Sequence, residues 1–350
     1  MNRERLALAV GMSCLLALVA SGGFGPPVSS TAKNIGNLGL VRAMRPTGQP
    51  VERDRALNGA LSWFDVAADY GPGIGDTPKG RGLALRERGD FEGAEIALAE
   101  YLANRPSDSS ARLELGDIAY QLGKVDLAYW WWRQVPGERG FISRATQHVA
   151  QGKLELARLE LEVAEASVST HDGSGALSLE LAHGYASLAR AYRSALRLEE
   201  HSEACDAGKS AYELALRRIP SGHPSEGPAR IYYGIALREC GKLAESVAQL
   251  QMIGSGYSSG QQAWASAELG TTYLIANDLE AALAHLERAV ALDPDHGGHR
   301  IMLGHLYARM GWKEDALRQY QIVLETSDAR WRAWAESEVR ALELENEAAP

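Results

Sequence analysis

Residues 264–294 read WASAELGTTYLIANDLEAALAHLERAVALDP, and the expected fold follows from this stretch. Leu269 and Tyr273 are four residues apart, which places them on one face of a helix. Asn277 and Asp278 are residues typical of a turn, and a second apolar stripe that includes Leu286 follows them. The stretch therefore predicts two amphipathic helices joined by a short turn.

Small residues occur where the two helices would meet. Gly270 and Ala282 allow close approach of the backbones, so that larger side chains can interlock around them. Pro294 ends the second helix and begins the connection to the next unit. One such hairpin keeps an apolar face that it cannot bury alone, so we expect neighbouring hairpins to stack.

The pattern recurs along the chain, and its clearest copies have a period of 34 residues. Gly270 and Gly304 are 34 positions apart, as are Gly82 and Gly116. Further copies are weaker, and residues 176–219 are helical in pattern but out of period, with both helices lengthened. The weaker or irregular copies cover residues 145–164, 176–219 and 230–253.

The order of residues within a copy resembles the signature of the tetratricopeptide repeat (TPR) family: Leu-Gly, Tyr three residues later, then Ala, an aromatic residue or Leu, Ala, and Pro. This resemblance implies an all-α fold, a right-handed α-solenoid of stacked TPR-like helical hairpins without any β-sheet. About seven hairpins would cover nearly the whole chain after its N-terminal hydrophobic signal or anchor helix. In that family the first helices of the repeats line a concave groove in which partners bind.

The sequence predicts four consecutive parts. They are a signal peptide or signal-anchor helix (1–27), a linker with a degenerate first hairpin (28–74), a TPR solenoid of about six further hairpins, irregular around 166–220 (75–326), and a C-terminal capping helix and tail (327–350).

The N-terminal segment has the composition of an export signal. Arg3 and Arg5 precede an almost wholly apolar run from Leu6 to Ala20. Extended through Phe24, the run is nearly long enough to span a bilayer, so a cleaved signal peptide and an uncleaved anchor both stay open. We expect an extracytoplasmic protein, exported or membrane-anchored, whose only membrane contact is through residues 6–24 if the segment is kept.

Composition excludes several classes of protein. The 350 residues are 45% hydrophobic, which argues against a disordered chain. The formal net charge is −9 and the pI about 5.6, with both signs interspersed, so no nucleic-acid partner is expected.

Two cysteines lie in the part expected to fold, because Cys14 belongs to the leader. Cys205 and Cys240 fall on adjacent expected helices whose ends could be neighbours. A disulfide is therefore one possibility in an exported protein, and two buried free thiols are the other.

No segment carries a strong signature of catalysis, a cofactor or a metal. His296, His299 and His305 lie near Asp293, but the cluster coincides with an inter-repeat turn and lacks a second ligand group. The glycine-rich stretch 71–80 lacks the ending of a phosphate-binding loop. We therefore expect no enzyme activity, no cofactor and no metal.

Trp130, Trp131 and Trp132 are three consecutive tryptophans. Successive helical residues point about 100° apart, so these rings cannot all face one core. Trp132 is expected to be buried with Ala128, and at least one other ring to lie at a repeat interface or on the surface. There it would fill a packing gap or form an aromatic contact for a partner or a membrane.

The register of the repeats predicts which residues face the groove. Their mixture of apolar, aromatic and a few polar side chains suits an amphipathic helix or an extended peptide. One class of TPR proteins binds the terminal carboxylate of chaperone tails with a clamp of Lys and Asn, and the mainly apolar residues at the equivalent positions here disfavour such a partner. The candidate partner-binding residues are Leu113, Asp117, Tyr120, Ile231, Ile235, Arg238, Trp264, Thr271, Leu274, Ile301 and His305.

The sequence thus favours a non-enzymatic scaffold that binds a protein or peptide partner in the cell envelope or extracytoplasmic space. The alternative is an exported binding module for a non-protein ligand such as an envelope polysaccharide, which would use the tryptophans and tyrosines.

Overall fold

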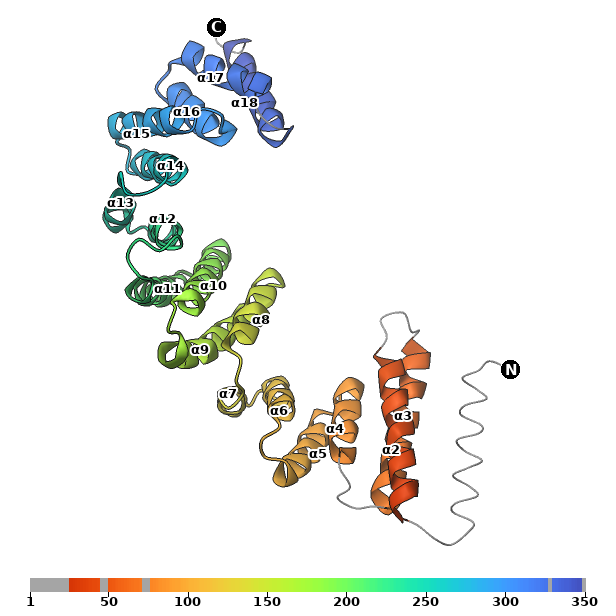
Figure 1. The fold of residues 1–350 in the computed structure, drawn as a ribbon. Helices are drawn as coiled ribbons and strands as arrows, with labels where there is room; N and C mark the ends of the chain where they lie inside the picture. The colour runs from red at the N-terminus through yellow and green to blue at the C-terminus, as the bar shows by residue number, and fades with distance from the viewer. Residues whose placement is uncertain (1–24, 45–49, 71–75, 327–328, 348–350) are drawn as a thin grey trace. The chain divides into compact units, whose positions relative to one another are not determined.

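The computed structural model describes residues 25–44, 50–70, 76–326 and 329–347. Within these ranges all regular secondary structure is α-helical and no β-strand occurs, as the sequence predicts (Figure 1). The chain divides into two compact units, residues 1–136 and 137–350. No helix in the described part of the chain is long and apolar enough to cross a membrane, and the apolar run Leu6 to Ala20 lies outside that part.

The first unit is a series of helical hairpins, with each helix packed against the next. Its helices are α2 (Gly25–Ala43), α3 (Pro50–Tyr70), α4 (Thr77–Arg88), α5 (Phe91–Asn104), α6 (Ser109–Gln121) and α7 (Val125–Trp132).

The hairpin of α2 and α3 begins slightly earlier than the sequence indicates. The sequence predicts that the leader ends at residue 27, but Pro26 and Pro27 lie in the first turn of α2. A helix tolerates proline there because the first N–H groups have no partner within the helix. Phe64 of α3 is fully buried, and glycine at positions 36 and 80 leaves room for its ring.

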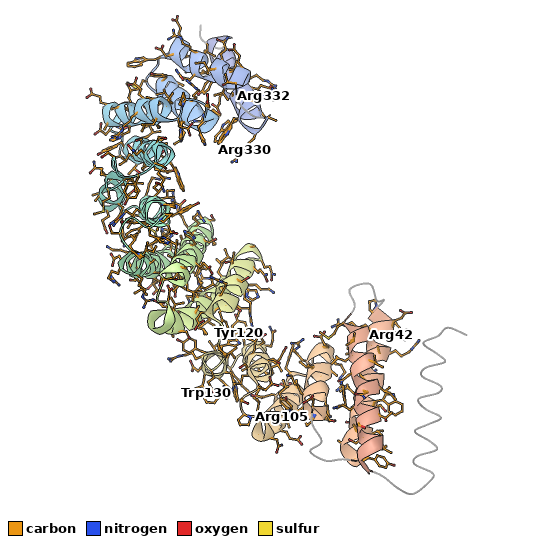
Figure 2. All side chains as sticks on the ribbon, in the orientation of Figure 1. Arg42, Arg105, Tyr120, Trp130, Arg330 and Arg332 are labelled. Carbon is orange, nitrogen blue, oxygen red and sulfur yellow. A yellow bond between two sulfur atoms is a disulfide. The ribbon has the colours of Figure 1, made fainter. Side chains whose placement is uncertain are left out.

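The three tryptophans of α7 take different environments. Trp132 is fully buried, as predicted, and its indole Nε1 donates a hydrogen bond to Asp117 at 3.0 Å. Trp131 packs against the core of the first unit, whereas Trp130, labelled in Figure 2, is 54% exposed. The expectation that one ring reaches the surface is therefore confirmed.

The second unit contains five hairpins followed by a single helix. Its helices are α8 (Glu138–Ala150), α9 (Leu154–His171), α10 (Ala176–Ser194), α11 (Leu198–Arg218), α12 (Glu226–Glu239), α13 (Leu243–Gln251), α14 (Ser259–Ile275), α15 (Leu279–Leu292), α16 (Gly297–Arg309), α17 (Lys313–Thr326) and α18 (Ala329–Glu347). Residues 77–326 thus form seven hairpins, where the sequence indicates about six.

The turn inside each of these hairpins uses one residue in the left-handed backbone region. Glycine occupies the position in five hairpins and Asn277 in another, with a φ of 63°. Leu196, with a φ of 59°, occupies it between α10 and α11 and is largely exposed. The glycines are Gly89, Gly123, Gly152, Gly241 and Gly311.

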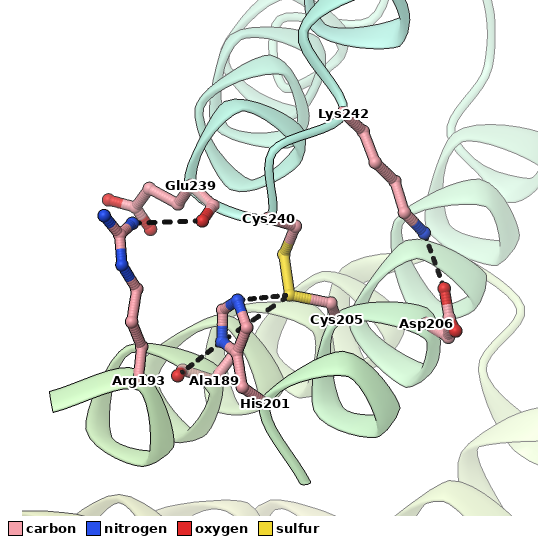
Figure 3. The surroundings of a disulfide bond; sticks show 8 residues. All are labelled: Ala189, Arg193, His201, Cys205, Asp206, Glu239, Cys240 and Lys242. Carbon is pink, nitrogen blue, oxygen red and sulfur yellow. Dashed lines mark hydrogen bonds and ion pairs between the residues drawn. A yellow bond between two sulfur atoms is a disulfide. The ribbon is translucent and has the colours of Figure 1, made fainter. Parts of the chain in front are cut away.

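A disulfide joins two neighbouring hairpins of the second unit. Cys205 of α11 is bonded to Cys240, the residue that ends α12, with a Cα–Cα distance of 5.9 Å (Figure 3). Lys242 pairs with Asp206 at 2.5 Å beside the bond. The possibility of two free thiols is therefore wrong for this structure.

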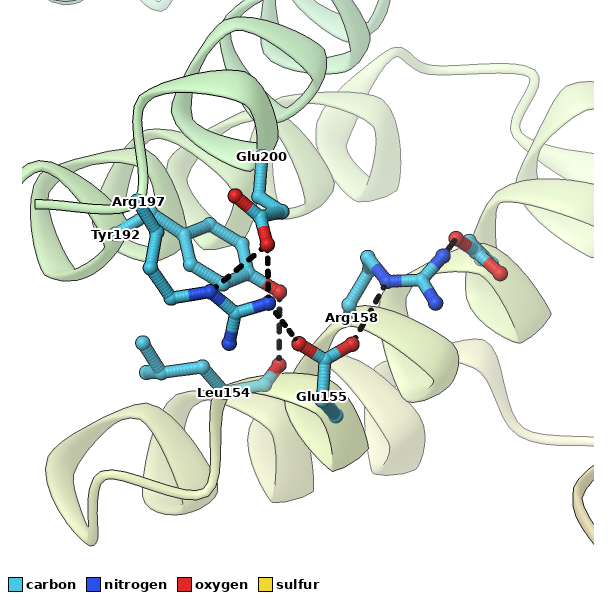
Figure 4. A network of polar contacts seen from close by, with 7 residues as sticks. Leu154, Glu155, Arg158, Tyr192, Arg197 and Glu200 are labelled. Atoms are coloured by element: carbon cyan, nitrogen blue, oxygen red, sulfur yellow. Dashed lines mark hydrogen bonds and ion pairs between the residues drawn. The ribbon is translucent and has the colours of Figure 1, made fainter. Parts of the chain in front are cut away.

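The out-of-period hairpin is long, as predicted: α10 has 19 residues and α11 has 21. A polar network joins it to α9 (Figure 4). Arg197 pairs with Glu155 and Glu200, and its guanidinium lies 4.8 Å from the ring centre of Tyr192.

Helix α18 covers the end of the second unit. Ala335 and Leu342 are buried against Ile301 and Val323 of the last hairpin. The opposite side of the helix is largely polar and exposed, as a capping helix requires.

Candidate partner-binding surface

First helices of the hairpins lie along one side of the second unit and second helices along the other (Figure 1). Three aromatic rings connect successive first helices. His183 of α10 is 4.9 Å from Tyr232 of α12, and Tyr232 is 5.1 Å from Trp264 of α14, measured between ring centres. His183 and Tyr232 are exposed. These three residues form what we term the aromatic row.

A pocket of about 420 Å³ lies at the end of this row, between α14, α16 and α18. Its surface includes small residues, Gly260, Ala267 and Gly298, with Ile301 among the apolar groups. Aromatic and imidazole rings form much of the rest. They are Trp264, His296, His299, His305, Trp331 and Trp334.

Contacts between rings hold the side chains of α18 in place along one side of the pocket. Trp331 and Trp334 stack with centres 5.9 Å apart, and Trp331 lies 5.6 Å from His296. A Cβ at position 298 would come within 2.8 Å of the Trp331 ring, so glycine is needed where α18 crosses α16. Residues 331 and 334 share a face of α18 because they are three positions apart.

Among the described residues that line the pocket, the carboxylates of Glu268 and Asp293 are the fully charged groups. Glu268 accepts a hydrogen bond from Trp264 Nε1 at 3.2 Å and forms an ion pair with Arg238 at 2.6 Å. Asp293 is the second carboxylate of the pocket, and it has no ion pair within the described residues. At the rim, His305 Nε2 lies 3.2 Å from Glu338 without the geometry of a hydrogen bond.

His299 is the buried polar group of the pocket. It is 5% exposed, and its Nδ1 has no hydrogen-bond partner in the described part of the chain. Burial, together with the smaller effect of neighbouring His296, lowers the pKa of its imidazole to about 4, although Asp293 acts in the opposite direction. A ring nitrogen bonds to the backbone of Asp293, so Nδ1 is left as an acceptor in the neutral ring.

Two segments of the chain match a known family of repeats. A model of the family described as tetratricopeptide repeat matches residues 80–130 and 267–328, which fall in the first and second units respectively. Both segments of the chain therefore match tetratricopeptide repeats. The second segment includes part of α14 and all of α16, two of the helices that line the pocket.

Solved structures with similar folds are TPR proteins of low sequence identity. PilW, a type IV pilus biogenesis factor, is 14% identical, with 73% of this chain and 94% of that chain covered and a TM-score of 0.35. Pseudomonas aeruginosa PilF is 17% identical (59% and 86% covered, TM-score 0.36), and yeast Tom70 is 11% identical (99% and 74%, TM-score 0.39). No curated protein matches the sequence.

The structure distributes the predicted groove residues over several environments. Trp264, Ile301 and His305 line the pocket. Ile231 is 0% exposed in the core, so it is not available to a partner, and Ile301 is 1% exposed. The predicted face therefore includes both residues at the surface and residues that are buried between helices.

The remaining candidates contact other residues within the hairpins. Arg238 pairs with Glu268, as noted, and Thr271 donates to the carbonyl of Ala267. Ile235 and Leu274 are partly buried against apolar clusters. In the first unit, Leu113 is partly buried, Asp117 accepts from Trp132, and the ring of Tyr120 lies 6.0 Å from that of Trp132.

Sequence reasoning missed several residues of the pocket. Trp331 and Trp334 were assigned only to the cap, and His299 only to a turn. The pair of tryptophans three apart was the available signal, because such a pair makes an aromatic stripe on one helical face. His296 does act at a turn: it is the N-cap of α16 and accepts from the His299 backbone N–H at 3.3 Å.

The other sequence-based hypotheses concern metal and phosphate. The described residues contain no group of three or more His, Cys, Asp or Glu side chains arranged to hold a metal ion. Residues 71–75 of the glycine-rich stretch lie outside the described residues.

Proposed function

We propose that this protein is a non-enzymatic TPR scaffold whose second unit binds a protein or peptide partner on its first helices. The observation that carries the proposal is the pocket between α14, α16 and α18, which opens at the end of the aromatic row. Tryptophan and tyrosine are the residues that most often dominate binding energy at protein interfaces. A partner segment would lie along His183, Tyr232 and Trp264 and place one side chain in the pocket.

A peptide fits this surface better than a partner protein with a broad flat surface does. The row offers successive rings on successive helices, and the pocket is near the small end of ligand sites, which range from about 300 to 1,000 Å³. Such an arrangement favours an extended or helical segment with one anchoring side chain.

Selection of binders from a random linear peptide library on the full-length chain tests the proposal. Selected peptides should lose at least about tenfold in affinity for Trp334→Ala. Trp312→Ala is the matched control, because Trp312 and Trp334 are both 46% exposed and only Trp334 lines the pocket. Failure to select any peptide, or selection of peptides indifferent to Trp334→Ala, would refute binding at this surface.

An envelope polysaccharide is the second candidate ligand. The stacked rings of Trp331 and Trp334 could contact the apolar face of a sugar as well as a peptide. A glycan array decides between the two: saccharide binding that Trp334→Ala abolishes, without any peptide binder, would replace the first proposal with the second.

We further propose that the protein is exported or membrane-anchored. The apolar N-terminal run and the Cys205–Cys240 disulfide both support this location, because disulfides persist mainly in oxidising compartments. Thiol labelling of acid-quenched cells tests it in a Cys14→Ser background. Cys205 and Cys240 should react with a maleimide only after reduction, whereas labelling without reductant would contradict export.

A further inference from the structure

We infer that the pocket between α14, α16 and α18 receives the cationic side chain of a lysine or arginine from the partner. This inference rests on the proposed function and specifies the residue that anchors the bound segment.

The walls of the pocket suit an organic cation. Indole faces attract ammonium and guanidinium groups through the negative charge of the ring face. One such contact already exists in the chain, because the guanidinium of Arg330 lies 4.8 Å from the ring centre of Trp331. Trp334 stacks on Trp331 and keeps 46% of its surface exposed, so its indole is accessible to an incoming group.

The charges of the pocket also favour a cation. Glu268 and Asp293 line it, and neither lysine nor arginine does. Arg238 offsets the charge of Glu268 through their ion pair, but no described residue offsets Asp293 in this way. A bound lysine or arginine would give Asp293 the partner that it lacks.

The imidazole of His299 supplies a third, independent observation. Its Nδ1 is buried without a partner, which costs free energy unless a ligand donates to it. An ammonium or guanidinium N–H can donate there, because the neutral ring carries a lone pair on this atom. A carboxylate can only accept and would meet two other carboxylates. A purely apolar side chain would leave both Nδ1 and Asp293 without partners.

The experiment compares capped pentapeptides, Ac-Gly-Ala-Xaa-Ala-Gly-NH2, on the full-length chain. Xaa is lysine, arginine, norleucine or glutamate, so that norleucine keeps the length of lysine without its charge. Binding is followed through the indole N–H signals of Trp264, Trp331 and Trp334 in 1H–15N spectra. The lysine and arginine peptides should bind about tenfold tighter than the norleucine peptide, and the glutamate peptide should be weakest.

Variants separate the contributions of charge and aromatic face. Asp293→Asn should weaken the lysine peptide about three- to tenfold, whereas Asp295→Asn, two positions away and exposed outside the pocket, should not. Fluorinated tryptophan should weaken the lysine peptide but leave the norleucine peptide unchanged, because fluorine withdraws charge from the ring face without removing the ring.

Several outcomes would overturn the inference. Norleucine binding as tightly as lysine would show an apolar pocket, and tightest binding by glutamate would show an anion site. No response of the three indoles up to about 10 mM peptide would exclude a side-chain pocket of any kind. In each case the library selection decides separately whether this surface binds peptides, so the two proposals can fail independently.

Discussion

Single glycines decide how closely the helices of a hairpin approach. Gly116 of α6 faces Trp132 of α7, and a Cβ at position 116 would overlap the indole ring. Gly116→Ala should therefore destabilise the protein by about 1–3 kcal/mol, although alanine is the better helix former. Gly59→Ala is the control, because nothing lies within 4 Å of that Cβ, and it should be neutral or stabilising. Urea unfolding of both variants measures the difference, and equal midpoints would contradict it.

The buried imidazole of His299 should make stability depend on pH. Its pKa is lowered to about 4 in the folded protein from an ordinary value of 6.5, so the unfolded chain binds the proton more readily. The contribution of the neutral His299 ring to the free energy of unfolding is therefore full above pH 6.5. It is lost as the pH falls toward 4, and the loss between pH 7 and 5 is about 2 kcal/mol.

Urea unfolding at several pH values tests this dependence. His299→Gln should remove most of the slope between pH 7 and 5, whereas His223→Gln, an exposed residue before α12, should keep it. An unchanged slope in His299→Gln would assign the effect to other groups.

At the scale of whole elements, α18 is held to the last hairpin by the apolar face that includes Ala335. Ala335 is fully buried against the last hairpin, while Ala333 on the same helix is exposed. Ala335→Arg would bury an unpaired charge, which costs several kcal/mol, so α18 should detach instead. Hydrogen exchange should show lost protection in α16, α17 and α18 for Ala335→Arg and none for Ala333→Arg. Full protection in both would mean that α18 is not anchored by this face.

The disulfide links α11 to the end of α12 across a sequence separation of 35. Closing a loop of that length restricts the unfolded chain and should stabilise the second unit by about 3–4 kcal/mol. Cys205→Ala/Cys240→Ala should lose this amount in urea unfolding, whereas Cys14→Ser should not. A double variant as stable as the unaltered protein under oxidising conditions would show that the bond does not constrain the unfolded chain.

At the scale of the molecule, the hairpins could be predicted from sequence because their determinants are local. Gly270, Ala282 and Pro294 lie within one repeat, and their spacing alone defines two helices and a turn. The pocket could not, because α14, α16 and α18 contribute rings from three separate parts of the chain. The disulfide likewise depends on the distance between two hairpins, which the sequence does not contain. The right-handed superhelix stays a prediction.

Repeat architecture predicts that damage to one hairpin spreads only to its neighbours, because each unit packs only on the units beside it. Gly270→Ala would place a Cβ 2.6 Å from Leu286 Cγ, which should open the hairpin of α14 and α15. Hydrogen exchange should therefore rise most in those helices, less in α13 and α16, which pack on them, and not at all in α2 to α7. Gly260→Ala, with open space around its Cβ, should leave the pattern unchanged. A uniform rise over all helices would show instead that the whole chain unfolds as one cooperative body.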